Sequence, residues 1–291
     1  MTAVPSTQGR RRRATTDRVA TVALASTVAV TLVPLVAVLA FTVVRGAGAL
    51  TLDFLTHSMR GVGPLDATGG AYHAILGTLE QVGLASLIAV PVGLLVAVYL
   101  VEYGTGSLRT IVRFLVDVMT GIPSIVAGLF VFAFWVVGLR RGFSGFAASL
   151  ALAVLMLPVV VRSAEEMLKL VPNDLREASY ALGVPRWRTI LSVVLPTASS
   201  GITTGVMLAV ARVTGETAPL LLTAFGFDAI RSSPFGGPQS GLPLFVFSQA
   251  GSAFDVAVRR AWAGALTLIL IVLLLTIGAR VLSARTRPKA A

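Results

Sequence analysis

The sequence predicts an all-α protein that is embedded in a membrane and crosses it six times. Only 13% of the 291 residues are charged and 55% are hydrophobic, whereas a soluble domain carries about 25% charged residues. The mean hydropathy is +0.86, and six apolar runs approach or exceed the roughly 20 residues that cross a bilayer. The absence of cysteine excludes structural disulfides and thiolate metal sites.

The six expected spans differ in the charge that they carry. The first has no charged residue, the second contains Glu80, the third has Asp117 in its first turn, and the fifth holds Arg212 and Glu216. Several spans also contain proline, which kinks membrane helices and leaves carbonyls for neighbouring helices to satisfy. The spans are residues 19–44, 74–101, 114–139, 146–161, 192–222 and 261–282.

The distribution of basic residues predicts the orientation. The net charge is +11, and no soluble fold is apparent that would present this charge to nucleic acid. With a cytoplasmic N-terminus, 16 of the 24 Lys and Arg residues fall on cytoplasmic segments and seven on outer ones. Because lysine and arginine collect on the cytoplasmic side, we expect both termini there. Residues 1–18 and 283–291 are then cytoplasmic tails, the first of them disordered.

Four consecutive arginines precede the first apolar run, as in a secretory signal peptide. The apolar region of a signal peptide is only about 7–15 residues long, and residues 19–44 form a longer run. We therefore expect a retained membrane helix at this position.

One amphipathic, charged segment interrupts the apolar pattern between the fourth and fifth spans. It reads DLREASYALGVPRWRTILSVVLP, residues 174–196. Asp174 and Glu177 have the spacing of a capping box that starts a helix. Gly183 suits the position after a helix end, and Pro185 suits the first turn of a following helix. The pattern predicts a short helix, a tight turn and a second helix, and it fits an interfacial helix equally well.

Within this segment, REASYALGVPRWRTILSVVLP resembles the cytoplasmic loop of ABC-importer permeases, whose pattern is E-A-A, three residues, G, nine residues, I-x-L-P. Glu177, Ala178 and Gly183 match it, Ser179 replaces an alanine, and VVLP stands in for I-x-L-P. The resemblance implies a type I ABC importer permease fold with a coupling loop over residues 162–191. In this family the short helix sits in a groove of the ATPase subunit. The implied ATPase-coupling residues are Glu177, Ala178, Gly183 and Pro185.

Two further stretches resemble the phosphate-specific permeases of the PstA type. They are RVTGETAPLLLTAFG, residues 212–226, and MLPVVVRSAEEMLKLVPNDLREASYALG, residues 156–183. The likeness covers roughly residues 74–282. It implies a permease for inorganic phosphate in the bacterial cytoplasmic membrane, with a second related permease subunit, two copies of an ATP-binding subunit and an extracytoplasmic phosphate-binding protein as partners.

Arg212 is the best candidate for contact with a passing anion. Phosphate needs a compensating cation in the membrane, and a guanidinium stays protonated and matches phosphate oxygens. Glu216 lies four residues further on, so the pair can act as a replaceable counter-ion or as a structural clasp. Arg162, near the cytoplasmic mouth, is a second pathway candidate or a flanking anchor. Four arginines flank spans on the outer face and can attract anions, help to dock a binding protein, or serve as solvated charge: Arg140, Arg141, Arg259 and Arg260.

Other chemistry has little support in the sequence. The chain has two lysines and no G-x-x-x-x-G-K-[ST] motif, so ATP must be hydrolysed by a separate subunit. His57 and His73 are far apart and no cluster has metal spacing, so we expect neither a metal nor another cofactor. The alternatives are a permease for sulfate or molybdate, a membrane scaffold or sensor with an interfacial helix, and a passive channel.

Overall fold

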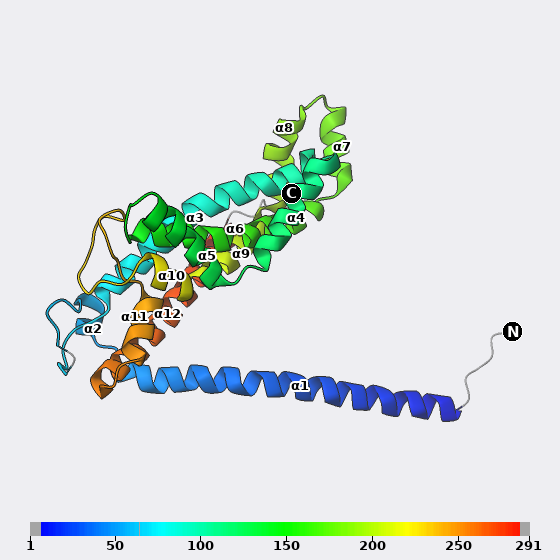
Figure 1. The fold of residues 1–291 in the computed structure, drawn as a ribbon. Helices are drawn as coiled ribbons and strands as arrows, with labels where there is room; N and C mark the ends of the chain where they lie inside the picture. The colour runs from blue at the N-terminus through cyan, green and yellow to red at the C-terminus, as the bar shows by residue number, and fades with distance from the viewer. Residues whose placement is uncertain (1–6, 64, 286–291) are drawn as a thin grey trace.

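A computed structural model describes residues 7–63 and 65–285 of the chain (Figure 1). These residues form helices joined by short turns and two longer loops, with one isolated bridge between Phe225 and Gln239. The α-helices are α1 Thr7–Ala47, α2 Leu52–Thr56, α3 Tyr72–Val98, α4 Gly106–Thr120, α5 Ser124–Val131, α6 Gly145–Lys169, α7 Asn173–Ala181, α8 Arg186–Thr189, α9 Leu195–Thr214, α10 Ala218–Thr223, α11 Leu242–Ala250 and α12 Asp255–Arg285. Wider π-helical turns follow α3, α5 and α8 at Tyr99–Tyr103, Phe132–Gly138 and Ile190–Val194.

Five of the described helical segments are long and apolar enough to cross a membrane. The pair Gly106–Thr120 and Ser124–Gly138 makes a sixth span if it is counted as one. This confirms the expectation of an all-α, multi-pass membrane protein, while the cytoplasmic location of the termini stays a prediction.

Helix α6 is the centre of the bundle. Two thirds of the residues in its most apolar 18-residue stretch are buried inside the protein. Helix α6 packs against α3, α9, α5, α4 and α10. Small residues allow the close approach of helices that membrane packing requires. At Gly93 of α3, an added Cβ atom would come within 2.7 Å of a methyl carbon of Val160 on α6.

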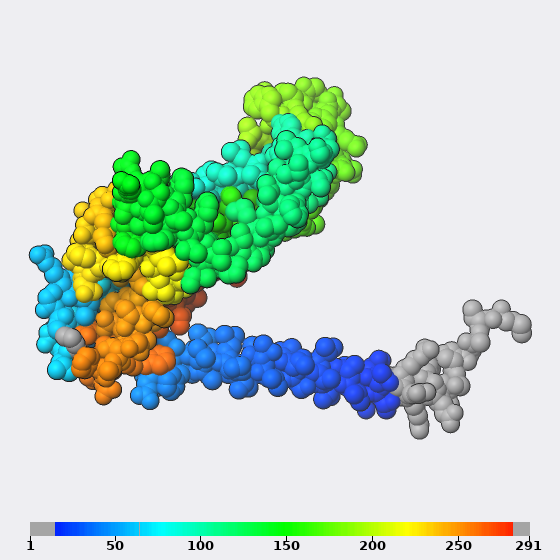
Figure 2. Space-filling view, viewed as in Figure 1, coloured from blue at the N-terminus to red at the C-terminus, as the bar shows by residue number. Residues whose placement is uncertain are grey.

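Helix α1 stands apart from this bundle. Figure 2 shows it leaving the body as a rod that meets the rest of the chain only near its C-terminal end. There Phe41 packs edge-on against Trp262 of α12, with ring centroids 5.2 Å apart. Only 6% of the residues in the most apolar 18-residue stretch of α1 are buried. Its side chains therefore face lipid or another protein.

The structure corrects the two ends of the chain. Helix α1 begins at Thr7, so residues 7–18, expected to be disordered, are helical, while residues 1–6 lie outside the described part. The arginines and alanines of this stretch favour helix and continue the span without a break. At the other end α12 reaches Arg285, and residues 286–291 are likewise outside the described part.

The third span is bent, not the single helix expected over residues 114–139. Helix α4 begins earlier, at Gly106, and meets α5 at an angle of 107°. The bend lies between Thr120 and Ser124. Pro123 has no N–H to continue the helical hydrogen bonds, and Gly121, which lacks a Cβ atom, allows the backbone to change direction.

The fifth span also differs from the expected helix over residues 192–222. A continuous helical segment runs from Arg186 to Thr214 and then stops. Glu216 lies in the turn before α10, and Pro219 sits in the first turn of that short helix. Gly215 follows the end of α9, and Pro219 lies in the first turn of α10. The sequence pattern alone does not distinguish such a break from a kink within one helix.

Short helices lie at both ends of the bundle. Helices α7 and α8 project at one end of the bundle, and α2 and α11 lie at the other (Figure 1). At the latter end the loop before α11 is fixed by buried amides. Gln81 donates to the side-chain oxygen of Gln239 at 3.0 Å, and Gln239 donates to Glu80 at 2.5 Å.

Candidate translocation and coupling site

The Arg212–Glu216 pair lies at the break between α9 and α10. Arg212 Nε is 3.9 Å from Glu216 Oε1, and the two side chains are 54% and 19% exposed. Thr214 ends α9, and the backbone N–H groups of Gly215 and Glu216 then donate to the carbonyls of Arg212 and Val213. At 3.9 Å the contact is at the limit of an ion pair, so the two side chains are held together only loosely.

A second helix break leads into the same region. Helix α5, which follows the bend in the third span, packs against α10. Gly128 of α5 faces Pro219 of α10 so closely that an added Cβ atom would lie 2.6 Å from the proline Cα. Membrane transporters commonly form substrate sites where helices are discontinuous, and here the two discontinuous spans meet at Gly128 and Pro219, three residues after Glu216.

Arg162 is held by carboxylates. Its Nη1 is 2.8 Å from Glu165 Oε2, and its Nη2 contacts Asp117 Oδ1 on α4. The fully buried Glu165 also receives Arg113 Nη2 at 2.5 Å and Lys169 Nζ at 3.1 Å. Sequence reasoning identified Arg162 but missed this cluster, although the spacing of Glu165 and Lys169 along α6 was a signal. The contacts of the described residues join Arg162 to α4 and not to Arg212.

The coupling segment has the predicted order of helix, tight turn and helix. Helix α7 ends before Gly183, whose φ of +76° places it in the left-handed region. The N–H groups of Gly183 and Val184 close the turn on Tyr180 and Ser179. The predicted capping box is wrong in detail, because α7 begins at Asn173 without a side-chain cap and Asp174 lies inside its first turn. Pro185 is the residue immediately before α8.

The outer surface of α7 and the following turn is open to solvent. The four predicted coupling residues, Glu177, Ala178, Gly183 and Pro185, are all exposed. Leu182 beside them is also exposed, at 83%. An exposed apolar and acidic surface on a projecting helix fits a docking element.

The inner surface of α7 is fastened to the membrane helices. Arg176 donates to Glu102 from Nε and Nη2 at 3.1 and 2.8 Å, and both side chains are nearly buried. Ser179, which departs from the alanine of the family pattern, forms a buried 2.8 Å hydrogen bond with Thr189 of α8. Sequence reasoning missed both partners. Glu102 is remote along the chain from Arg176, and Thr189 lies on a different helix from Ser179. These contacts join α7 to the π-helical turn after α3 and to α8.

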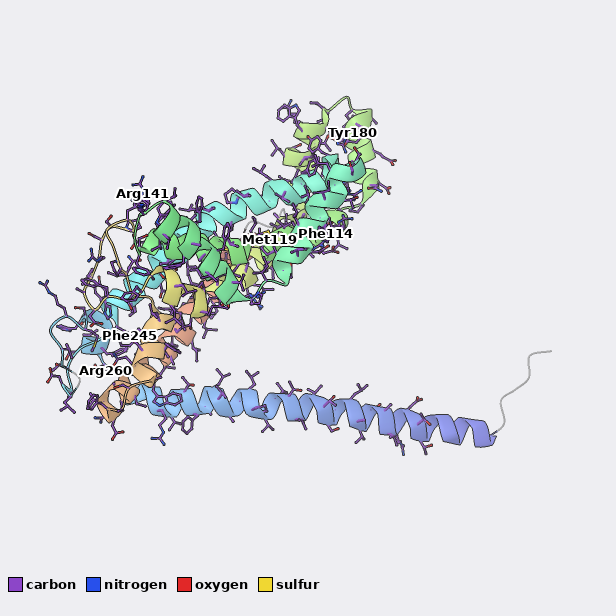
Figure 3. The ribbon with its side chains drawn as sticks, in the orientation of Figure 1. Phe114, Met119, Arg141, Tyr180, Phe245 and Arg260 are labelled. Atoms are coloured by element: carbon purple, nitrogen blue, oxygen red, sulfur yellow. The ribbon has the colours of Figure 1, made fainter. Side chains whose placement is uncertain are left out.

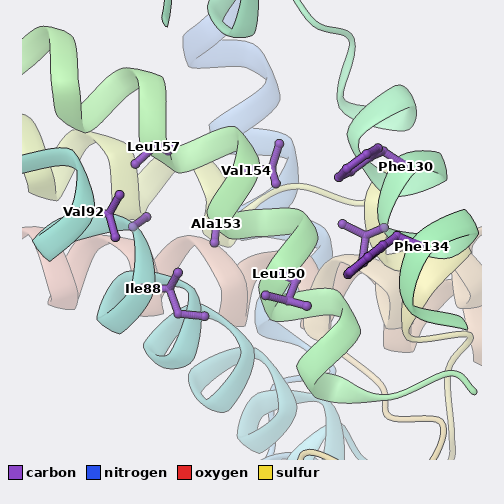
Figure 4. Close-up of a pocket in the computed structure, with 10 residues that line it drawn as sticks. Ile88, Val92, Phe130, Phe134, Leu150, Ala153, Val154 and Leu157 are labelled. Atoms are coloured by element: carbon purple, nitrogen blue, oxygen red, sulfur yellow. The ribbon is translucent and has the colours of Figure 1, made fainter. Parts of the chain in front are cut away.

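One cavity between the membrane helices is a poor candidate for an anion. A cavity of about 210 Å³ between α3, α5 and α6 is lined only by apolar side chains, including Ile88, Phe130 and Phe134 (Figure 4). It offers no donor to phosphate. Among the described residues, no group of three or more His, Asp or Glu side chains is placed to hold a metal ion.

The fold and the projecting coupling segment are those of a multi-pass membrane component of a transporter. Residues 89–288 match the family model described as "Binding-protein-dependent transport system inner membrane component", and the chain belongs to this family. Solved structures agree in fold. A bacterial alginate ABC transporter has a TM-score of 0.65 and 15% identity over 96% of this chain and 99% of that one, and the MetNI methionine ABC transporter has 0.59 and 20% over 75% and 95%.

Within the family the chain is a PstA-type permease. It is 48% identical over 269 residues to "Phosphate transport system permease protein PstA 1" of Mycobacterium tuberculosis strain H37Rv, covering 92% of this chain and 87% of that one. It is 42% identical over 272 residues to the PstA protein of Yersinia pestis, covering 93% and 91%.

Proposed function

We propose that the chain is the permease subunit of an ABC importer that moves inorganic phosphate across the inner membrane, with ATP hydrolysed by a separate subunit. The observation that carries the proposal is a weakly paired, half-exposed Arg212 within a membrane span of a chain nearly half identical to phosphate transport permeases. A sulfate or molybdate permease is the runner-up, since the same guanidinium fits any tetrahedral oxyanion.

The partners follow from the same reading. One of two copies of an ATP-binding subunit docks on the exposed surface of α7, and the other docks on a second related permease. That second permease covers part of α1, and an extracytoplasmic phosphate-binding protein delivers the anion. The low burial of α1 and the exposure of Glu177, Ala178, Gly183 and Pro185 support these contacts. With α7 in the cytoplasm, both chain termini lie there as well.

The proposed path passes Arg212 and uses Glu216 as its resting partner. Arg162 has a supporting role in this proposal: held by Asp117 and Glu165, it keeps α4 against α6 near the cytoplasmic mouth. This arrangement favours release, because phosphate meets one weakly held cation and not a permanent tight site.

Arg212→Gln tests the role of the guanidinium. In proteoliposomes that contain the assembled transporter, we expect phosphate uptake to fall about 10- to 100-fold, because a charge-assisted contact is worth about 1.5–3 kcal/mol. Arg212→Lys should recover only part, since lysine lacks the bidentate fork. Arg141→Gln, which removes an exposed arginine (labelled in Figure 3) that makes no ion pair with a described residue, is the matched control. Normal uptake by an assembled Arg212→Gln complex would refute the proposal.

A crosslink tests the coupling role against a scaffold or a passive channel. A cysteine introduced at Ala178 should crosslink to a cysteine in the groove of the co-purified ATPase, because Ala178 is exposed on the open surface of α7. A cysteine at Ala164, which is buried in α6, is the control that should not react. An intact co-purified complex that gives no crosslink at Ala178 would favour the scaffold.

A further inference from the structure

A pocket at the outer end of the molecule is lined by three arginines. Its volume is about 430 Å³, and it lies between the end of α1, the loop around α2 and the start of α12. Figure 3 places Arg260 at this end, far from Tyr180 on the coupling helix. The lining arginines are Arg45, Arg259 and Arg260.

Arg260 is a buried cation that no carboxylate contacts directly. It is only 5% exposed. Its Nε donates to Gln249 Oε1 at 3.2 Å, and its Nη1 donates to the backbone carbonyls of Asp66 and Thr68 at 2.9 and 2.8 Å. All three acceptors are neutral, and within the described residues no carboxylate oxygen comes within 4 Å of its guanidinium. Buried charges in proteins are normally paired, because an unpaired one loses its hydration without compensation.

The other two arginines add positive charge at the mouth of the same pocket. Arg45 and Arg259 are exposed, and neither forms an ion pair with a described residue. The carboxylate of Asp66 acts on Arg260 through its charge alone, since it accepts the backbone N–H of Gly63 at 2.7 Å, and Asp255 is exposed at the start of α12. Three guanidinium groups therefore share one cavity and lack a paired carboxylate.

We propose that this pocket binds the phosphate group of an anionic ligand. Guanidinium forks match phosphate oxygens, and the neutral acceptors around Arg260 hold its fork in a fixed orientation. Val256, in the first turn of α12, also lines the pocket, so the positive end of that helix dipole adds to the field. Two sources present this chemistry at the outer surface, the headgroup of an anionic phospholipid and free inorganic phosphate. The site is separate from Arg212 and does not depend on the transported substrate.

The test uses the assembled transporter in nanodiscs and carries Arg212→Gln throughout, so that phosphate in the membrane path does not contribute. One arm adds phosphatidylglycerol to phosphatidylcholine discs and counts retained phosphatidylglycerol by native mass spectrometry. The other measures binding of radiolabelled inorganic phosphate in discs of phosphatidylcholine alone. The test variant is Arg45→Gln with Arg259→Gln, which leaves the hydrogen bonds of Arg260 intact. The matched control is Arg140→Gln with Arg141→Gln, two exposed outer arginines.

We expect saturable binding of at least one ligand and a loss of affinity of about tenfold for each arginine removed, with no loss in the control. Arg260→Gln should abolish binding where it still assembles. Retention of phosphatidylglycerol alone identifies a lipid headgroup site, and binding of phosphate alone identifies a free-anion site. If neither ligand binds, or if the test variant and the control bind equally well, the proposal is overturned.

Discussion

Replacing Arg176 with methionine should loosen the coupling helix from the membrane helices. Besides its two hydrogen bonds to Glu102, Arg176 donates to the carbonyls of Val171 and Leu168 at 2.7 and 3.0 Å. The side chain of Glu102 is 4% exposed, so the substitution leaves a buried carboxylate without a counter-ion. Breaking one side of a buried pair costs about 3–5 kcal/mol, much more than an exposed pair is worth.

The assay is thermal unfolding of the assembled transporter together with ATP-driven phosphate uptake. A loss of about 3 kcal/mol at roughly 3 °C per kcal/mol lowers the melting temperature by about 10 °C, and uptake should fall while the ATPase subunit still hydrolyses ATP. The matched control is Arg186→Met on α8, which removes only a cation–π contact 4.9 Å from the Tyr103 ring centroid. Addition of Glu102→Gln should recover part of the stability, because no buried charge is then left unpaired. If the Arg176→Met and Arg186→Met transporters have the same melting temperature, the reasoning is wrong.

Three further substitutions probe the same machinery. Gly183→Val should lower stability by about 1–2 kcal/mol and weaken co-purification of the ATPase, since a left-handed φ is strained for a branched residue; unchanged melting would contradict the role of this turn. Ser179→Ala should cost about 1 kcal/mol by removing the hydrogen bond to Thr189, whereas a melting temperature at or above that of the parent would show that the bond adds nothing. Gly128→Val should separate α5 from α10 at Pro219 and reduce uptake more than it reduces expression; full uptake would mean that this contact is dispensable.

Sequence patterns were sufficient for features that are local along the chain. The apolar runs located the spans, and Gly183 located the end of the coupling helix, because both depend on neighbouring residues. The four-residue spacing of Arg212 and Glu216 likewise predicted their pairing, even though the helix ends between them. The Glu165 cluster escaped prediction because Arg113 comes from a different helix, and one sequence alone does not show which helices face each other.

The breaks in the third and fifth spans could be suspected but not located from the sequence. Proline occurs in several spans, and Pro91 and Pro158 lie inside helices that continue through them. Pro123 instead accompanies a bend of 107°. At Pro123 the backbone leaves the helical region, with a ψ of 140°, and the presence of a proline alone does not show which of the two outcomes occurs.

The contrast between α1 and α6 predicts where mutations will be tolerated. A side chain that faces lipid needs only to be apolar, because hydrocarbon adapts to any shape. A side chain wedged between helices must also have the right volume, since interiors are close-packed. Exchanges among leucine, valine, isoleucine and phenylalanine should therefore be nearly silent along the outer turns of α1, whereas the loss or gain of a single methylene at Leu152 or Val160 should be selected against.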